Sequence, residues 1–418
     1  MLRVRMISGE EVASIPLEKF REEPCDVKSL KRRLSQLKDM PPRFRQRLLL
    51  QGQTFEDTAN LDSAMDLELV LMPFADVSEA QVNDLAAAAE QGFVNEVESM
   101  LRLPQDPNSH DCSGFTALMR ACDSGAVEAV RLLLEAAADT ELADRTSGWT
   151  ALIMASQRGR IEVVRLLLDA GAEKDAADRS SLTALMKASA NGHVEVVRLL
   201  LAAGANKDLA ENRARTALMV ASECGSVDVV RLLLQAGAAK ELAGVGGYTA
   251  LLTAAEKGHV EIVRLLLDAG ADKDCKLPRL GSTPLMLASR DNHVEVVRLL
   301  LEAGAKMDLP DSFGRTAVSF AKHSGNTAIV QLLSCATIAK ERFQECFSPW
   351  DRREEPSSAR HGEDAWQRRH HDCNMLSDVC FVIAALIRRK CKWNKEEFSK
   401  KLQSAIKLLS EAVCVFLS

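Results

Sequence analysis

Aromatic side chains are scarce in this chain, where they make up 4% of 418 residues and include a single Tyr. Apolar residues still reach 47%, so the interior must be built mainly from aliphatic side chains. No apolar run approaches the roughly 18 residues that a membrane-spanning helix needs, and the first residues lack the pattern of a secretory signal. We therefore expect a cytoplasmic or nuclear protein with no transmembrane segment.

Cysteine spacing favours neither disulfides nor metal binding. The eleven cysteines are odd in number, scattered, and never arranged as Cys-x-x-Cys, which is typical of reduced thiols in a cytosolic or nuclear protein. A C-terminal group matches none of the usual zinc spacings: His370, His371, Cys373, Cys380 and Cys391. The sequence predicts no metal site and no cofactor.

Basic charge is too sparse over most of the chain for nucleic-acid binding. The formal charge of −6 divides into 0 for residues 1–74, −9 for 75–339 and +3 for 340–418, whereas a surface that holds phosphate backbones is normally basic. Residues 28–47 do contain eight basic side chains and one acidic one, and a solvated helix face explains them. We expect no nucleic-acid partner.

A repeat of 33 or 34 residues occupies the middle of the chain. Each copy begins with threonine followed by Ala-Leu or a close variant, then continues with a glycine turn and a Leu-rich segment. This pattern predicts a short helix, a turn, a second helix and a polar loop, here called the finger, that leads to the next threonine. The threonines are Thr116, Thr150, Thr183, Thr216, Thr249, Thr283 and Thr316.

These copies resemble the ankyrin repeat, and residues 182–208 follow the family's pattern closely. The resemblance implies an α-solenoid of about eight ankyrin units over residues 83–337, with atypical first and last units because a terminal repeat lacks a neighbour. In the first ankyrin repeat, Asn83 replaces the threonine. Methionines such as Met119 and Met186 replace the family's usual histidine, so we expect apolar packing to substitute for the histidine-to-threonine hydrogen bond.

The first 74 residues carry no repeat and show a different pattern. Alternating apolar residues over 2–6, a turn at 8–11 and residues 12–17 predict a hairpin. A helix is expected after Asp26, and strands over 47–50 and 67–71. This order is similar to the ubiquitin-like β-grasp fold, most specifically through Pro41-Pro42, the segment 46–52 and the closing strand, and implies a small α+β domain over residues 1–74.

The same resemblance implies a ubiquitin-like patch made of Arg47, Leu49 and Val70. No Gly-Gly pair follows the last expected strand, since the chain continues into Pro73 and Phe74. We therefore expect an integral docking module that is not conjugated to other proteins. The alternative is a small packed cap with no partner of its own.

Beyond Thr337 the repeat pattern ends. We expect a mobile, charge-mixed linker over residues 338–373, followed by a helical tail of two helices over 374–418. The apolar stretch from Val379 to Ile387 is nine residues long, which is too short to cross a bilayer. A helical hairpin, a partner-binding helix and a membrane-surface element stay open for this tail.

Catalytic groupings are not indicated. A hydrolase needs a nucleophile, a base and an orienting group together, whereas His193, His259 and His293 recur at one repeat position, as structural residues do. An Asp or Glu also precedes an Arg by three residues in six units, which predicts pairs on a helix surface. We expect no enzyme activity.

The positions that do not follow the repeat are the candidates for function. They lie directly before each threonine, on the finger, and on the first helix of each unit, which the ankyrin resemblance places toward a concave face. Aromatic and Arg side chains often dominate protein interfaces. The predicted protein-binding set is Phe115, Arg120, Trp149, Met154, Leu182, Lys187, Arg215, Tyr248, Leu287 and Arg315. The alternative is that the rings only pack between fingers.

The sequence therefore predicts a monomeric, non-enzymatic scaffold whose concave face binds a partner protein of unknown identity. A second hypothesis is an adaptor, in which the N-terminal domain docks to ubiquitin or proteasome machinery while the repeats select the client.

Overall fold

The computed structural model describes residues 2–16, 26–37, 40–61, 63–103 and 105–347, and the side chains of these residues as far as 338. The chain divides into two compact units, residues 1–212 and 213–418. The two helices expected over 374–418, and most of the expected linker, lie outside the described residues.

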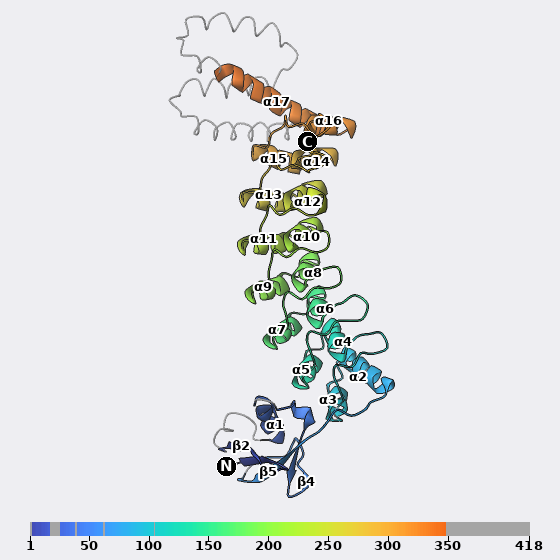
Figure 1. Ribbon diagram of the computed structural model, residues 1–418. Coiled ribbons are helices and arrows are strands. Elements are labelled where there is room, and N and C mark those ends of the chain that lie inside the picture. The colour runs from blue at the N-terminus through green and yellow to red at the C-terminus, as the bar shows by residue number, and fades with distance from the viewer. Residues whose placement is uncertain (1, 17–25, 38–39, 62, 104, 348–418) are drawn as a thin grey trace, which may run out of the picture. The chain divides into compact units, whose positions relative to one another are not determined.

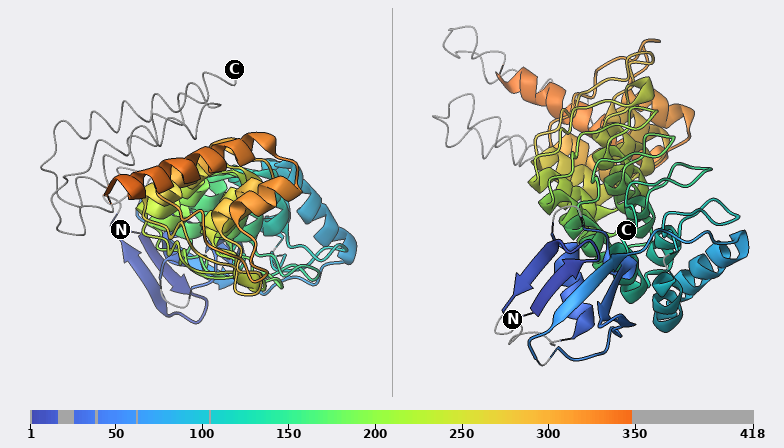
Figure 2. Two further views of the ribbon diagram at one scale, coloured as in Figure 1. Left: turned by 90° about the horizontal axis from the view of Figure 1, so that it is seen from above. Right: turned by 60° about the horizontal axis from the view of Figure 1, so that its bottom comes forward.

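The N-terminal part of the first unit is a small α+β domain (Figures 1 and 2). Its strands are β1 Leu2–Met6, β2 Glu11–Ile15, β3 Gln46–Leu50, β4 Gln53–Thr54 and β5 Asp66–Leu71. They form one sheet in the order β2-β1-β5-β3-β4, in which β1 and β5 run parallel and the other pairs antiparallel. The expected strands and helix are present, whereas β4 was not foreseen because two residues carry no periodicity.

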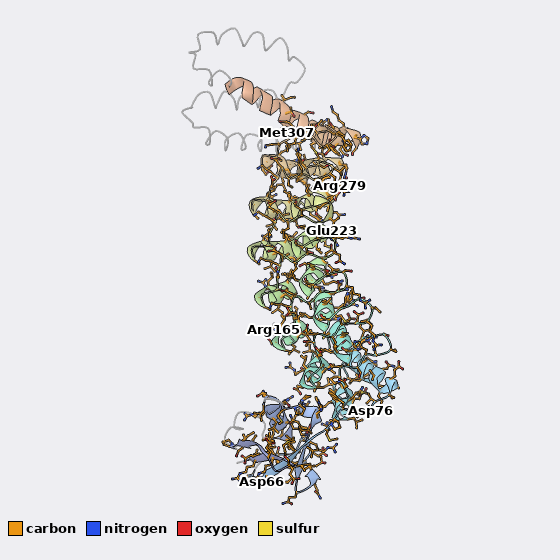
Figure 3. The ribbon with its side chains drawn as sticks, in the orientation of Figure 1. Asp66, Asp76, Arg165, Glu223, Arg279 and Met307 are labelled. Carbon is orange, nitrogen blue, oxygen red and sulfur yellow. The ribbon has the colours of Figure 1, made fainter. Side chains whose placement is uncertain are left out.

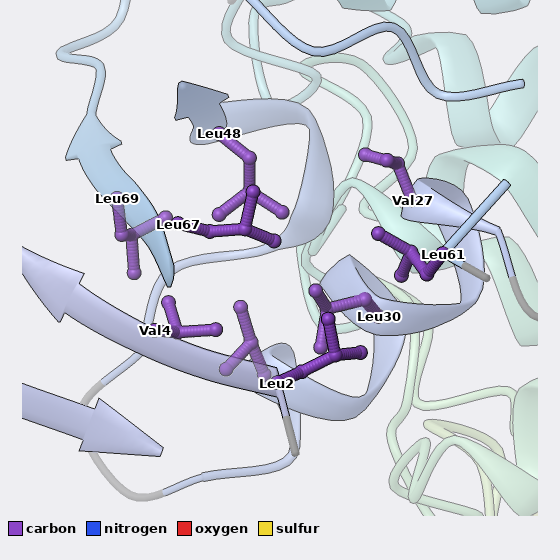
Figure 4. Close-up of a cluster of buried hydrophobic side chains, with 9 residues drawn as sticks. Leu2, Val4, Val27, Leu30, Leu48, Leu61, Leu67 and Leu69 are labelled. Atoms are coloured by element: carbon purple, nitrogen blue, oxygen red, sulfur yellow. The ribbon is translucent and has the colours of Figure 1, made fainter. Parts of the chain in front are cut away.

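Helix α1 (Val27–Ser35) begins where the sequence predicted, because the Asp26 carboxylate accepts the Ser29 N–H at 2.8 Å. Its apolar side packs on the inner face of the sheet (Figure 4). The fully buried members of the core are all aliphatic, namely Leu2, Val4, Val27, Leu30, Leu34, Leu48, Leu61, Leu67 and Leu69. Each such side chain contributes about 1.5–3 kcal/mol.

The rest of the first unit consists of four helix pairs (Figure 1). They are α2 Glu79–Gln91 with α3 Val94–Arg102, α4 Ala117–Ser124 with α5 Val127–Glu135, α6 Ala151–Gln157 with α7 Ile161–Asp169, and α8 Ala184–Ala190 with α9 Val194–Ala202. First helices pack on first helices and second helices on second helices, so each pair is covered by its neighbours.

The second unit repeats this arrangement with four more pairs. They are α10 Ala217–Cys224 with α11 Val227–Gln235, α12 Ala250–Lys257 with α13 Val260–Asp268, α14 Pro284–Arg290 with α15 Val294–Glu302, and α16 Ala317–His323 with α17 Thr327–Phe347. A short 3-10 turn, η3 (Val245–Gly247), lies in one finger.

The repeated threonines cap the first helices. In six of the repeats the threonine Oγ1 accepts the backbone N–H three residues later at 3.3–3.5 Å. In two of the repeats the methionine sulfur also accepts the threonine N–H, at 3.4 Å from Thr116 to Met119 and from Thr283 to Met286. Met119 and Met286 are buried, so the expected apolar packing is joined by a weak polar contact.

Both ends of the repeat region extend past their expected boundaries. Helix α2 begins at Glu79 because Ser78 and Gln81 form a capping box, and Asn83 therefore lies inside the helix. The Asn83 side chain accepts the Cys112 N–H at 2.9 Å, which ties the helix to the next finger. Helix α17 continues over 338–347, the expected start of the linker, where no Gly or Pro interrupts it.

Candidate functional site

A buried carboxylate shapes each of four fingers. The Asp111 carboxylate accepts the N–H groups of Ser113 and Phe115 at 2.9 Å. Asp144, Asp178 and Asp311 accept equivalent bonds in their fingers. These bonds fix the residue that precedes the threonine, which is where the sequence placed much of its candidate surface. The carboxylates themselves were not predicted as functional, although their recurrence five or six residues before the threonine was visible in the sequence.

Hydrogen bonding keeps two of the finger carboxylates, Asp144 and Asp311, ionised. Burial alone would raise the pKa of Asp144, but hydrogen bonds from the Thr146 hydroxyl and from the N–H groups of Ser147 and Trp149 outweigh it and hold this pKa below its ordinary value. The pKa of Asp311 is lowered in the same way, because the bonds from Arg315 and Phe313 outweigh its burial.

Trp149 and Lys187, both predicted, meet in the first unit. The Trp149 Nε1 donates to Asp178 Oδ2 at 3.1 Å. The Lys187 Nζ, on α8, lies 4.4 Å from the Trp149 ring centroid and 3.4 Å from the same Asp178 oxygen. The ring, the cation and the finger carboxylate therefore hold one another in a half-buried cluster, and the cation–π contact contributes about 0.5–2 kcal/mol.

Phe115 and Arg120 form a second cluster of the same kind. The Arg120 guanidinium lies 4.5 Å from the Phe115 ring centroid and 2.8 Å from Asp111 Oδ2. It also lies 3.9 Å from Glu90 on α2. Two neighbouring fingers of the first unit thus present a ring beside a cation that a buried carboxylate positions.

In the second unit, a third cluster has Arg315 as its cation, at the position directly before the threonine. Its guanidinium lies 4.6 Å from the Phe320 ring, 5.0 Å from the Phe313 ring and 2.8 Å from Asp311 Oδ2. The finger here supplies the cation while α16 supplies one of the rings. Phe313 was not among the predicted residues, because it stands two positions before the arginine.

Tyr248 belongs to an apolar cluster. It packs with Cys275 against the buried Leu252, Leu277 and Leu287. Its hydroxyl donates to Glu256 Oε1 at 3.4 Å. Leu277 stands where four other fingers have the buried aspartate, so apolar contacts replace carboxylate bonds in this finger.

Two predicted binding residues are core residues. The side chains of Met154 and Leu287 are only 3% and 1% exposed, so neither can contact a partner directly. Both lie on first helices at positions where the residue type varies among repeats. Such variation occurs at buried positions as well as at exposed ones, so it could not show that these two side chains are buried. Leu182 and Arg215 are half-buried outside the ring–cation clusters, and Arg215 pairs with Glu223 at 2.7 Å.

The recurring histidines join consecutive repeats. Each Nε2 lies 2.9–3.1 Å from a backbone carbonyl of the preceding repeat, His193 on Gln157, His259 on Glu223 and His293 on Glu256. Arg160 and Asn326 make similar bonds at the same position. Over the described ranges, no three His, Cys, Asp or Glu side chains are grouped so that they could hold a metal ion.

The acid–arginine pairs expected on helix surfaces are also present. All six join side chains three residues apart at 3.4–3.9 Å, as between Glu162 and Arg165 on α7. Arg165 is labelled in Figure 3. Five of the six pairs are largely exposed, so each of these adds a few tenths of a kcal/mol, whereas the Arg298 side chain of the sixth pair is only 15% exposed.

The predicted patch of the N-terminal domain lies on the outer face of its sheet. Arg47 pairs in register with Val70 across β3 and β5, and Leu49 is two residues along β3 from Arg47. Arg47 is exposed, whereas Leu49 and Val70 are half-buried. The three residues therefore share one face, opposite the aliphatic core.

The basic residues of the N-terminal domain contact the first helix pairs of the repeats. The Arg43 side chain is 1% exposed and lies 2.6 Å from Glu135 on α5 and 3.3 Å from Glu98 on α3. Lys28 pairs with Glu98 at 2.9 Å, and Arg32 with Glu135 at 2.7 Å. The interpretation of residues 28–47 as a solvated helix face is therefore wrong for Arg43 and Lys28, because carboxylates distant in sequence neutralise them, whereas the Arg32 side chain is paired but still 44% exposed.

This network also perturbs Glu98. Burial would raise its pKa, but the hydrogen bond and charge of Lys28, with those of Arg43, outweigh the burial and hold the pKa below its ordinary value of 4.5. Glu98 is therefore ionised at neutral pH and holds two cations of the N-terminal domain against α3.

None of the helices in the described part of the chain combines the length and apolar character that a membrane span requires. The family model described as Ankyrin repeats (3 copies) matches residues 85–178, 173–243 and 238–311. No curated protein matches the chain. The helices from α3 to α15 and the fingers between them fall within these matches, which cover more than half of the sequence, and the chain belongs to the ankyrin-repeat family.

Proposed function

We propose that this protein is a non-enzymatic scaffold that binds a partner protein on the concave face formed by the fingers and first helices. Ankyrin repeats generally mediate protein–protein interaction. The observation that supports this surface is the pair of ring–cation clusters at Phe115–Arg120 and Trp149–Lys187.

These clusters have the properties of interface anchors. Each combines an apolar ring face with a cation, and such side chains supply much of the binding free energy at protein interfaces. Asp111 and Asp178 already hold the cations, so less side-chain entropy is lost when a partner binds. The recurring histidines are engaged with backbone carbonyls, which favours a scaffold over an enzyme.

Affinity capture with the full chain tests the proposal. We expect a double variant, Arg120→Ala with Lys187→Ala, to reduce recovery of the partner at least tenfold, since removal of a central anchor typically costs about 2 kcal/mol or more. The matched control removes two exposed arginines from second helices, Arg165→Ala with Arg198→Ala, and should retain the partner. Loss of the partner in the control alone would place binding on the second helices and contradict the proposal.

The adaptor is the second candidate function. We propose that the N-terminal domain is a ubiquitin-like β-grasp, supported by its strand order, its parallel central strands and the helix between β2 and β3. Arg47, Leu49 and Val70 on the outer face of the sheet would be its docking patch. Co-sedimentation with purified proteasomes tests this: a Leu49→Ser, Val70→Ser variant should lose binding, and retained binding would remove the patch from the proposal.

We also propose that the protein acts as a monomer in the cytoplasm or nucleus. The cysteines Cys112, Cys122, Cys224 and Cys275 are free thiols, which fits a reducing compartment. Sedimentation of the purified chain tests the monomer, and fluorescence of a tagged full chain tests the location.

A further inference from the structure

Backbone hydrogen bonds link the tips of successive fingers. The N–H near the start of one finger donates to a carbonyl three residues before the threonine of the preceding finger. In the first unit, Arg179 donates to Ser147 and Asn212 to Ser180, both at 3.1 Å. In the second unit, Val245 donates to Arg213 at 2.7 Å and Ser312 to Leu280 at 2.9 Å.

Pro278 interrupts this series in the second unit. A proline has no N–H to donate, and it occupies the donor position opposite the finger that contains Gly246. Among the described residues, the Gly246 carbonyl accepts no backbone hydrogen bond from a neighbouring finger. The two fingers still touch, because the Pro278 ring lies directly against Gly247 and leaves no room for a side chain there. One tip carbonyl is thus open beside an otherwise packed pair of fingers.

Exposed apolar side chains gather on the fingers around this interruption. Val245, Leu280 and Phe313 are 68%, 47% and 70% exposed and lie on three successive fingers of the second unit. The exposed tip residues of the first unit are instead polar or small, namely Cys112, Ser113, Arg145, Thr146, Arg179 and Ser180. The contact of the Pro278 ring with Gly247 and the Ser312–Leu280 bond hold these three tips side by side, and contiguous apolar surface in water ordinarily marks a binding site.

Buried side chains beneath the fingers and a backbone hydrogen bond between two fingers hold the apolar tips in place. Leu277 is buried with Leu252 and Leu287, and Tyr248 packs against the same cluster. The Ser312–Leu280 bond ties the next finger to this one. A partner would therefore meet fingers that are already ordered, which reduces the entropic cost of binding.

The charge around these tips is positive. Arg213 and Arg279 (Figure 3) are exposed, and the part of the chain that the structure describes provides no hydrogen-bond or ion-pair partner for either side chain. Asp311 is the one carboxylate in the tip segments 244–248, 277–282 and 311–315, and it is buried and bonded to Arg315. Acidic side chains would therefore complement this surface.

We propose that the tip segments 244–248, 277–282 and 311–315 bind an extended segment of a partner protein that combines acidic with apolar side chains. The partner's apolar groups cover Val245, Leu280 and Phe313, its carboxylates pair with Arg213 and Arg279, and one of its backbone N–H groups donates to the Gly246 carbonyl. This inference rests on the proposed scaffold function and adds the chemistry of a partner for the second unit.

Selection from a random dodecapeptide phage library on the full chain tests the inference. We expect the enriched peptides to be rich in Asp or Glu beside Leu, Ile or Phe. Fluorescence anisotropy with the synthetic enriched peptides then compares variants. A Val245→Ser, Leu280→Ser, Phe313→Ser variant should weaken binding at least tenfold, and Arg279→Glu should do the same with a shallower dependence on salt.

Matched controls separate the tips from other exposed residues. Leu103→Ser removes an exposed leucine at the end of α3, and Arg145→Glu reverses an exposed charge on a finger of the first unit; both should leave peptide affinity unchanged. The thermal unfolding of the tip variants should also be unchanged, because the altered side chains are exposed.

Two results overturn the inference. If no peptide is enriched, or if the enriched peptides are basic, the tips do not select acidic segments. If the enriched peptides bind the tip variant normally but lose binding to an Arg120→Ala, Lys187→Ala variant, the inference fails while the proposed scaffold function is supported.

Discussion

Two glycines with the same backbone conformation have different surroundings in the repeats. Gly258 and Gly237 both have φ of +75°. A methyl group on Gly258 would collide with the His293 ring, whereas nothing lies within 4 Å of the same position on Gly237. The first glycine therefore serves the turn and the contact with the next repeat, and the second serves the turn alone.

The pair Gly237→Ala and Gly258→Ala separates these two contributions. Gly237→Ala should lower the free energy of unfolding by about 1–2 kcal/mol, the cost of an L-residue in the left-handed region. Gly258→Ala should lower it by a further 1–3 kcal/mol, roughly the cost of overpacking. Urea denaturation measures both, and equal losses would mean that the His293 ring moves aside freely.

Arg43 is expected to anchor the N-terminal domain on the repeats. Arg43→Met leaves Glu98 and Glu135 with a weaker cationic environment, and breaking a buried ion pair costs about 3–5 kcal/mol. Arg47→Met on the exposed sheet face is the control and should stay within about 0.5 kcal/mol. Denaturant unfolding of the full chain measures both changes. A loss for Arg43→Met no larger than that of the control would show that the network is not stabilising.

Glu98 predicts a pH dependence of stability. Its folded-state pKa lies below the ordinary 4.5, so its stabilising contribution is complete above that value and is lost as the pH falls through the folded pKa. Glu98→Gln should therefore flatten the decline of unfolding free energy below pH 5 without abolishing it, because Asp144 and Asp311 also have lowered pKa values. An unchanged slope between about pH 5 and pH 3 would contradict this assignment.

At the scale of elements, periodic features were predictable and their ends less so. The threonine caps, the glycine turns and Asp26 located the helices correctly. The start of α2 was placed at Asn83 because the threonine frame was followed, while the local capping box of Ser78 and Gln81 acts earlier. A helix start can be predicted from its local capping residues. In a divergent terminal repeat, the capping residues and the alignment with the other repeats suggest different starts.

Ser78→Ala tests this capping box. Loss of an N-cap side chain costs about 0.5–2 kcal/mol, and it should increase hydrogen exchange in the first turn of α2. Ser180→Ala is the control, since that exposed residue uses its backbone N–H and not its side chain in the finger. If exchange in α2 stays as slow as in the unaltered chain, the helix is held by its packing on α4 and not by its cap.

At the scale of the whole molecule, the repeats share the same helix pairs and turns but differ in the side-chain clusters on their fingers. The first unit contains the ring–cation clusters of Trp149 and Phe115, and the second contains the apolar cluster of Leu277. Sequence variation identified most of these positions. It could not show that Met154 and Leu287 point inward, or that Asp178 joins Trp149 to Lys187, because these contacts link positions about one repeat apart.

Hydrogen–deuterium exchange of the full chain, with and without the partner recovered by affinity capture, tests the central claim most directly. Binding on the fingers and first helices predicts slower exchange over residues 111–120, 144–154 and 178–187, with little change in α5, α7 and α9. Slower exchange confined to these second helices, with the fingers unaffected, would contradict the account.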